Sequence, residues 1–243
     1  MIKNWYQTWF GNEYLTVYAH RDNDEAQQLI QLIHSYIYLD KDSKILDLCC
    51  GQGRHALILA REGYQVYGID LSRKLLEIAK YKKNPDQAAY FIQADMRSLP
   101  TVNSFDLLLN LFTSFGYFET DEENKSVFLQ FYQALKDGRY FVFDYFNDRF
   151  ISESLVPFHK EKIGDVLVEQ ERIIEGSRVQ KKIRITKNGR HSTFFESVQM
   201  YNPDQIFKML DDSNLSIDYV FGDYQGAVFE KNSPRLIVIG KKI

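Results

Sequence analysis

The sequence predicts an α/β fold with a doubly wound, largely parallel β-sheet in a single domain. Between residues 45 and 144, short apolar runs alternate with amphipathic helical segments. Strands that alternate with helices in this way are typical of parallel βαβ units. The strand segments are apolar throughout, as expected of a sheet that helices cover on both faces. The chain of 243 residues, 44% of them hydrophobic and 26% charged, is long enough for one such core over residues 1–243.

Charge and composition argue against several function classes. The formal net charge is −3, so no overall positive field favours a nucleic-acid partner. No run of about 18 apolar residues is present, which argues against a membrane span. The N-terminal sequence lacks the apolar core of a secretion signal, and the two cysteines are adjacent, which does not suit a disulfide framework. We therefore expect a cytoplasmic protein that contacts neither nucleic acid nor membrane.

Periodicity and helix-ending residues predict the elements in order. An apolar stripe from Ala26 through Ile30 to Ile37 predicts the first helix. Gly63 is expected to end the second helix and Ser72 to cap the third. The expected helices are residues 24–37, 53–61, 71–81 and 121–135, and the expected strands are residues 45–48, 64–69, 89–94, 105–110 and 139–144.

The alternation of strands and helices stops after about residue 147. Residues 166–174, 178–187 and 191–200 predict three strands, with turns at residues 175–177 and 188–190. Val179, Ile183 and Ile185 alternate with polar residues, as one half-buried face requires. We therefore predict a β-meander inserted over about residues 150–200. A helix over residues 204–210 and two strands over residues 215–221 and 236–239 follow, and these strands are expected to form an antiparallel hairpin at the sheet edge.

The turn after the first strand is the candidate ligand site, because ligands of open α/β sheets bind at the carboxyl ends of the strands. Gly51 and Gly53 allow close approach of a ligand to the backbone, and the helix beginning there directs free N–H groups at the same place. Asp70 ends the second strand and is placed to accept hydrogen bonds from both hydroxyls of a ribose. The alternative for Asp70 is a cap on the following helix.

Asp95 follows the third strand in the run Gln93-Ala94-Asp95-Met96. A carboxylate at this edge of the sheet is placed to accept a hydrogen bond from the exocyclic amine of adenine, with Met96 packing on the ring. The alternative is an aspartate that only forms a turn.

These motifs together resemble those of the class I S-adenosylmethionine-dependent methyltransferases over residues 40–145. The resemblance implies a seven-stranded sheet of order 3-2-1-4-5-7-6 with strand seven antiparallel, and S-adenosylmethionine as cofactor. It also implies that Asp47 approaches the methionine ammonium, although a buried acid there could instead brace the loop. The cofactor-binding residues implied at the strand ends are Asp47, Cys49, Gly51, Gly53, Asp70, Leu71, Ala94, Asp95 and Met96.

Cys49 departs from the family pattern, which often reads Gly-x-Gly-x-Gly at this loop. Its Cβ disfavours a positive φ, so we expect the backbone there not to adopt that conformation freely. Simple packing is the alternative role for Cys49 and Cys50, since no basic run nearby favours a thiolate.

Residues 110–118 are similar to a run found in small-molecule methyltransferases, including amino-sugar N,N-dimethyltransferases. This similarity implies that Asn110, Phe112 and Phe115 lie beside the sulfur end of the cofactor. Several members of that subgroup also insert antiparallel strands after strand five.

Residues 14–21 are similar to the lid region of the same subgroup. The similarity implies an N-terminal helical lid over about residues 1–38, with Tyr18 and Arg21 covering the methionine end and Arg21 reaching its carboxylate. A packed tyrosine and a solvated arginine are the alternative.

The resemblance implies methyl transfer by in-line displacement to a small-molecule acceptor. Nitrogen is the expected acceptor atom, because no histidine stands in a motif that marks it as a general base; the catalytic residue stays unassigned. No His/Cys/Asp spacing suggests a metal site. The basic run that contains Lys182 and Arg184 is either a solvated strand face or a contact for an anionic, phosphate-bearing acceptor. A homodimer is compatible with the sequence.

Two alternative functions remain open at this point. Gly51-x-Gly53-x-x-Ala56 also satisfies a dinucleotide fingerprint, and Asp70 would again bind ribose, so a nicotinamide-dependent oxidoreductase is the first. A non-catalytic cofactor-binding protein is the second. The Ala94-Asp95 pair and the closing hairpin favour the methyltransferase.

Overall fold

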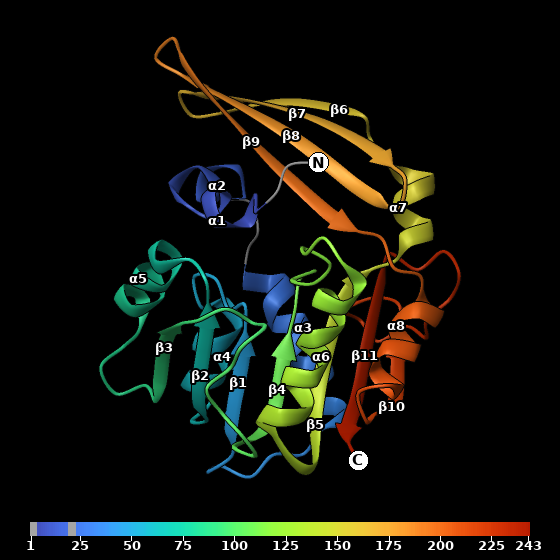
Figure 1. Cartoon of the computed structure of the whole chain (residues 1–243). Helices are drawn as coiled ribbons and strands as arrows, with labels where there is room; N and C mark the ends of the chain where they lie inside the picture. Colours follow the sequence, from blue (N-terminus) through green and yellow to red (C-terminus); the bar gives the residue numbers. More distant parts are fainter. Residues whose placement is uncertain (1–3, 19–22) are drawn as a thin grey trace.

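The computed structural model describes residues 4–18 and 23–243 of the chain, which form an α/β unit around a seven-stranded sheet (Figure 1). The strands lie in the order β10-β11-β5-β4-β1-β2-β3, with β11 antiparallel to its neighbours β5 and β10. This is the predicted order 3-2-1-4-5-7-6, so the fold class is confirmed. The strands are β1 (Lys44–Leu48), β2 (Gln65–Asp70), β3 (Ala89–Gln93), β4 (Phe105–Asn110), β5 (Leu135–Phe146), β10 (Leu215–Phe221) and β11 (Arg235–Lys242).

Helices cover both faces of the sheet, which is why its strands are apolar throughout. Ile45 of β1 faces the core under one set of helices, and its neighbour Leu46 faces the core under the other. The first set is α3 (Asn23–Tyr36), α4 (Arg54–Arg61) and α5 (Arg73–Lys82), and the second is α6 (Asp121–Ala134) and α8 (Pro203–Asp211). None of the helices in the described part of the chain is long and apolar enough to cross a membrane.

The insert after β5 is a separate antiparallel sheet of four strands, whereas the sequence predicts three. The strand that the prediction missed is the first, whose sequence Phe-His-Lys-Glu-Lys-Ile is mostly exposed and has no apolar alternation. Asn188 and Gly189 both have positive φ, as a two-residue hairpin turn requires. The insert consists of helix α7 (Asp148–Ser154) followed by β6 (Phe158–Ile163), β7 (Val166–Glu175), β8 (Arg178–Lys187) and β9 (Arg190–Gln199).

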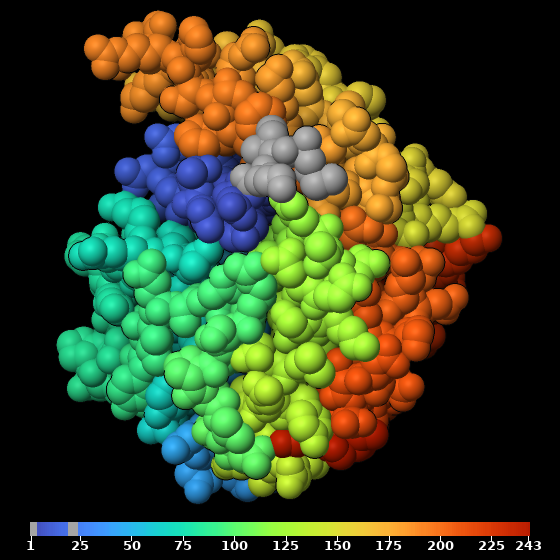
Figure 2. Space-filling view, viewed as in Figure 1, coloured from blue at the N-terminus to red at the C-terminus, as the bar shows by residue number. Residues whose placement is uncertain are grey.

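Two short N-terminal helices, α1 (Tyr6–Trp9) and α2 (Asn12–Val17), lie between the insert and the carboxyl ends of the central strands (Figures 1 and 2). The indole of Trp5 donates to the backbone oxygen of Ser197 in β9 at 3.0 Å. Helix α3, which also falls within the predicted lid over about residues 1–38, packs instead against α4. A lid role is therefore proposed below for residues 5–18 only.

Candidate functional site

The loop between β1 and α4 has an unusual backbone in which alternate residues are left-handed. Cys49, Gly51 and Gly53 have φ values of 64°, 55° and 79°. A Cβ on Gly53 would come within 3.0 Å of Phe91, so glycine is required there. Cys49 adopts the positive φ despite its Cβ, contrary to the expectation from the sequence, at a cost of about 1–2 kcal/mol. Its thiol contacts the sulfur of Met96 at 3.4 Å.

Two buried carboxylates fix this loop by accepting backbone hydrogen bonds. Asp47 accepts from the N–H of Ala56 at 3.2 Å, which caps the first turn of α4 because the N-cap residue Gly53 has no side chain. Asp70 accepts from the N–H groups of Gly51 at 2.8 Å and Ser72 at 2.7 Å. The side-chain cap of α5 is Ser72, as predicted. Asp70 therefore ties the loop to the end of β2.

A cavity of about 410 Å³ lies above this loop. It is bounded by the carboxyl ends of the central strands, by α1 and α2, and by the insert. The sequence-predicted residues that line it are Tyr18, Asp47, Cys49, Gly51, Asp70, Leu71, Ala94, Asp95, Met96 and Phe112.

Three of the predicted residues that the structure describes do not line the cavity. Gly53 faces Phe91, and Asn110 is fully buried, donating weakly to the backbone oxygens of Leu48 and Ser114. Phe115 belongs to the hydrophobic core and stacks on Phe128. These three support the cavity from behind, so the implied place of Asn110 and Phe115 beside the cofactor does not match this arrangement. Arg21 lies outside the described residues.

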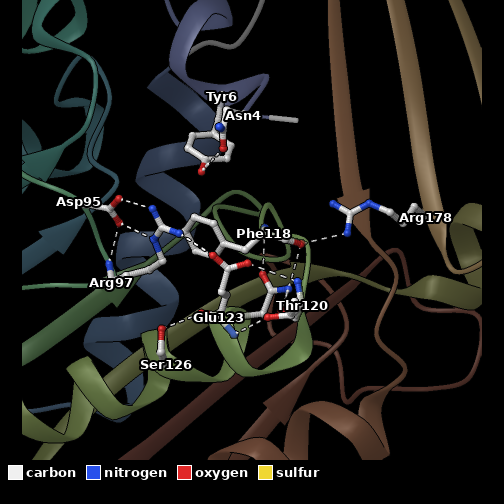
Figure 3. Close-up of polar contacts among 10 residues, drawn as sticks. Asn4, Tyr6, Asp95, Arg97, Phe118, Thr120, Glu123, Ser126 and Arg178 are labelled. Atoms are coloured by element: carbon white, nitrogen blue, oxygen red, sulfur yellow. Dashed lines mark hydrogen bonds and ion pairs between the residues drawn. The ribbon is translucent and has the colours of Figure 1, made fainter. Parts of the chain in front are cut away.

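Asp95 is at the expected edge of the cavity, but its carboxylate is already engaged (Figure 3). Arg97 donates to both of its oxygens, with distances of 2.7 Å and 3.1 Å, and also forms an ion pair with Glu123 at 2.9 Å. The guanidinium lies 4.1 Å from the centroid of the Phe118 ring. Burial alone would raise the pKa of Asp95, but the hydrogen bonds from Arg97 outweigh burial and lower it. The adenine contact of Asp95 stays a prediction.

The cavity wall beyond β4 is held in a strained conformation by contacts from distant segments. Phe112 and Thr113 both have positive φ. Asp144, at the end of β5, accepts from the N–H of Phe112 at 2.9 Å and from the guanidinium of Arg235 at 2.6 Å. Arg235 also donates to the hydroxyl of Thr113 at 3.1 Å. These contacts over-determine the loop, which is how such a backbone persists.

Several cavity residues were not singled out by the sequence patterns. They come from α1 and the residues beside it, from α4, from the loop after β4, from the insert and from β11, and no local motif joins them. The one local feature that could have pointed to some of them is the run of large aromatic residues at positions 5–10. The residues are Trp5, Tyr6, Phe10, Arg54, His55, Tyr117, Arg172, Lys181, Glu196 and Arg235.

Comparisons with known proteins agree with this geometry. Residues 45–138 match the family described as "Methyltransferase domain". The dTDP-3-amino-3,4,6-trideoxy-α-D-glucopyranose N,N-dimethyltransferase of Streptomyces venezuelae is 24% identical over 235 residues, which cover 91% of this chain and 96% of that protein. The dTDP-4-amino-2,3,4,6-tetradeoxy-D-glucose N,N-dimethyltransferase of Saccharopolyspora spinosa is 25% identical, covering 88% of each chain. A solved S-adenosylmethionine-dependent methyltransferase from Clostridium acetobutylicum ATCC 824 has a TM-score of 0.81 at 22% identity, covering 95% of this chain and 98% of that one.

This chain is an S-adenosylmethionine-dependent methyltransferase, with the matched methyltransferase domain at residues 45–138. The oxidoreductase and the non-catalytic protein, the two alternatives that the sequence left open, find no support in these relatives.

The buried charges of the methyltransferase suit a cationic cofactor. Burial raises the pKa of Asp47 to about 7, against the opposing hydrogen bond from Ala56. Burial also raises the pKa of Asp70. Within the described part of the chain, neither carboxylate accepts a hydrogen bond from a cationic side chain. The sulfonium and ammonium of S-adenosylmethionine would supply the missing positive charge beside them.

The cysteines of the loop are not nucleophiles. Burial raises the pKa of both Cys49 and Cys50 well above the usual value, and the neighbouring carboxylates raise it further. Both thiols therefore stay protonated at neutral pH. Within residues 4–18 and 23–243, no group of three or more His, Cys, Asp or Glu side chains is arranged to hold a metal ion.

The left-handed backbone at Cys49 predicts how substitutions at this position rank in their free energy of unfolding. Cys49→Gly relieves the strain but loses the sulfur contact, so its free energy of unfolding should stay within about 1 kcal/mol of wild type. Cys49→Val adds a β-branched side chain at positive φ and should lose roughly 2 kcal/mol or more. Denaturant unfolding checks both values. Cys49→Ala, which keeps Cβ and loses the sulfur, is the matched control. If Cys49→Val were as stable as Cys49→Gly, the strain would be refuted.

Asp47 predicts a pH dependence of stability in the cofactor-free enzyme. Because its folded pKa is about 7 and an unfolded aspartate titrates near 3.9, the folded state binds more protons between these values. Stability contributed by this group should therefore fall as pH rises from about 4 to 7. Asp47→Asn keeps an acceptor for the Ala56 N–H and should gain stability relative to wild type across that window, by a few kcal/mol.

Denaturant unfolding at a series of pH values measures this difference. Asp211→Asn, at an exposed aspartate of α8, is the control and should follow wild type. A difference between wild type and Asp47→Asn that is the same at pH 4 and pH 8 would contradict the assignment.

Proposed function

We propose that this methyltransferase transfers the methyl group to the nitrogen of a small-molecule amine. The observation that carries the proposal is the lack of a suitable general base among the described residues that line the cavity. His55 is buried, and burial lowers its pKa to about 3, so it is a weak base at neutral pH. An amine acceptor brings its own lone pair, whereas a hydroxyl usually requires deprotonation.

The cavity carboxylates already have hydrogen-bond partners, and the cationic cofactor beside Asp47 would lower the raised pKa of that carboxyl, so these groups are poor candidates for the base. Asp47 and Asp70 accept backbone hydrogen bonds beneath the loop, and Asp95 pairs with Arg97. Glu196, in β9, accepts from Trp9 and Tyr18, each at 2.7 Å. The proposed acceptor atom is supported further by the two amino-sugar N,N-dimethyltransferases to which the chain is similar.

The cofactor supplies an activated methyl group on sulfur, and the protein contributes positioning and exclusion of water. Aromatic side chains of the N-terminal segment provide the cover. Trp5 lies edge-on to Tyr117 with 4.9 Å between ring centroids, and Tyr6 and Phe10 also pack against that ring. Holding reactants in line can lower a barrier by as much as roughly 7–11 kcal/mol. We therefore assign the proposed lid to residues 5–18.

Glu196 holds this lid against the insert. Besides Trp9 and Tyr18, it pairs with Lys181 of β8 at 3.2 Å. Burial would raise its pKa, but the charge of Lys181 and the three hydrogen bonds outweigh burial and lower it. Glu196 therefore stays ionised, and its charge-assisted hydrogen bonds connect the N-terminal segment with two strands of the insert.

An anionic acceptor requires a cation that faces the cavity, and the predicted pair does not provide one. Lys182 faces Glu171 at 3.6 Å and Arg184 is exposed. Neither lines the cavity, whereas their neighbours Val179 and Lys181 do. The basic face that the sequence singled out is thus the outer face of β8, and the contact with an acceptor has to come from the other face.

Arg172 is the better candidate for binding an anionic group of the acceptor. It lies on β7 opposite Lys181 and lines the cavity. Its guanidinium donates to two uncharged acceptors, the backbone oxygen of Val156 and the side-chain oxygen of Gln170. Arg235 and Lys181, which also line the cavity, are instead paired with carboxylates. A phosphate-bearing acceptor would give Arg172 a charged partner.

Nitrogen specificity is tested with a matched pair of acceptors. We expect an amino sugar linked to a nucleoside diphosphate to receive labelled methyl groups from S-adenosylmethionine, and the analogue with a hydroxyl in place of the amine to receive none. Product formation is followed by mass spectrometry and by the amount of methyl label that the acceptor carries. Methylation of the hydroxyl analogue at a similar rate would refute the nitrogen assignment.

Arg172→Gln should raise the KM for that anionic acceptor at least tenfold, because a hydrogen bond to a charged group contributes about 1.5–3 kcal/mol. The Kd for S-adenosylhomocysteine, measured by calorimetry, should change less than twofold. Arg184→Gln, on the outer face of the same sheet, is the matched control and should leave both constants unchanged. An unchanged KM in Arg172→Gln would remove the anionic subsite.

A further inference from the structure

His55 has a buried polar atom that the contacts described above leave unsatisfied. The side chain lies in the first turn of α4, is 5% exposed and lines the cavity. Its Nε2 has no hydrogen-bond partner in the described structure. A buried polar atom without a partner costs about 1–3 kcal/mol, and in a cavity wall this is a reason to expect a ligand atom at that position.

The order of the strands indicates which part of the cofactor comes near His55. Asp95 follows β3, and Asp70 ends β2. The next strands across the sheet are β1, whose loop leads to His55, and β4, which leads to Phe112. If the ribose is held at Asp70 and the base lies toward β3, the remaining arm of the molecule extends toward β1 and β4. That arm is the amino acid.

The surroundings of His55 favour a carboxylate over an ammonium. The His55 ring lies 5.3 Å from the ring of Phe112, and the guanidinium of Arg54 lies 4.6 Å from that same ring. Burial first, and the charge of Arg54 second, lower the pKa of His55. The imidazole is therefore neutral, and its protonated ring nitrogen can donate one hydrogen bond. A positive neighbour and a neutral donor together are suited to a negative group.

We propose that Nε2 of His55 donates a hydrogen bond to the amino-acid carboxylate of S-adenosylmethionine and so selects for the complete cofactor over its nucleoside portion. The proposal rests on the proposed placement of the ribose at Asp70. Asp47, in β1 on the other side of the glycine loop, is then left to face the ammonium of that amino acid. His55 is thus a binding and positioning residue and takes no proton in the reaction.

Two ligands that differ only in the amino-acid arm test the proposal. S-adenosylhomocysteine carries the arm, and 5′-methylthioadenosine keeps the base, ribose and sulfur without it. We expect His55→Phe to raise the Kd for S-adenosylhomocysteine, measured by calorimetry, at least tenfold, because a hydrogen bond to a charged group is lost. The Kd for 5′-methylthioadenosine should change less than twofold.

Three further variants separate the possible causes. The side-chain amide nitrogen of His55→Gln comes near the place of Nε2, so this variant should retain more affinity for S-adenosylhomocysteine than His55→Phe. If His55→Phe does not fold, His55→Gln replaces it in the comparison of the two ligands. Asp70→Asn should weaken the binding of both ligands, because both contain ribose. His191→Phe, at an exposed position of β9, should change neither.

The outcomes distinguish this inference from the proposed function. Equal weakening of both ligands by His55→Phe, or no weakening of either, would overturn the contact with the carboxylate. Equal losses in His55→Gln and His55→Phe would show that packing rather than the hydrogen bond is lost, and would overturn it as well. Failure of the wild-type enzyme to bind S-adenosylhomocysteine would instead overturn the cofactor site itself.

Discussion

The buried ion pair between Asp144 and Arg235 is the interaction on which the shape of the cavity depends. Asp144 is fully buried and joins two adjacent antiparallel strands, β5 and β11, to the loop after β4. It also accepts from the hydroxyl of Tyr224 at 3.0 Å. Removing one partner of such a pair leaves an uncompensated charge, at a cost of about 3–5 kcal/mol. The pair therefore makes the left-handed backbone at Phe112 and Thr113 the favourable one, and both of these residues line the cavity.

The two sides of the cavity are stabilised in different ways. The side formed by the central sheet depends on short-range contacts around one loop, where Asp47 and Asp70 satisfy backbone N–H groups. The opposite side depends on contacts between segments far apart in sequence, centred on Glu196 and on the indole of Trp5. Among the described residues, the backbone–backbone hydrogen bonds of α1 and α2 stay within residues 4–18, so this side is the part expected to open. A fixed cofactor side and an opening lid side suit an enzyme that must admit an acceptor and then exclude water.

The sequence predicted what is encoded locally. Strand and helix periodicity predicted the seven strand segments, the family resemblance implied their order in the sheet, and the spacing of Gly51, Gly53 and Asp70 located the loop. It did not predict the first insert strand, which is charged and exposed, or the Asp144–Arg235 pair, whose members are 91 residues apart. For the contact with an anionic acceptor, the sequence singled out Lys182 and Arg184. The alternation of Val179 with polar residues, however, already placed Lys181 on the apolar face of that strand. The unsatisfied nitrogen of His55 depends on all of its neighbours in space, which no local pattern contains.

The distribution of charge in the cavity gives a physical reason for an amine acceptor with an anionic group. Carboxylates lie beneath the loop at Asp47 and Asp70, and cations lie toward the insert at Arg172 and Lys181. A cationic cofactor stabilises the ionised carboxylates beneath the loop, because burial makes ionised Asp47 unfavourable when no cation lies beside it. An ammonium acceptor would then be repelled by the adjacent sulfonium, so the amine is favoured in its neutral, nucleophilic form. In the acceptor proposed above, an anionic group placed toward Arg172 would allow strong binding while the amine stays neutral. Electrostatics would then separate the part of that acceptor that binds from the part that reacts.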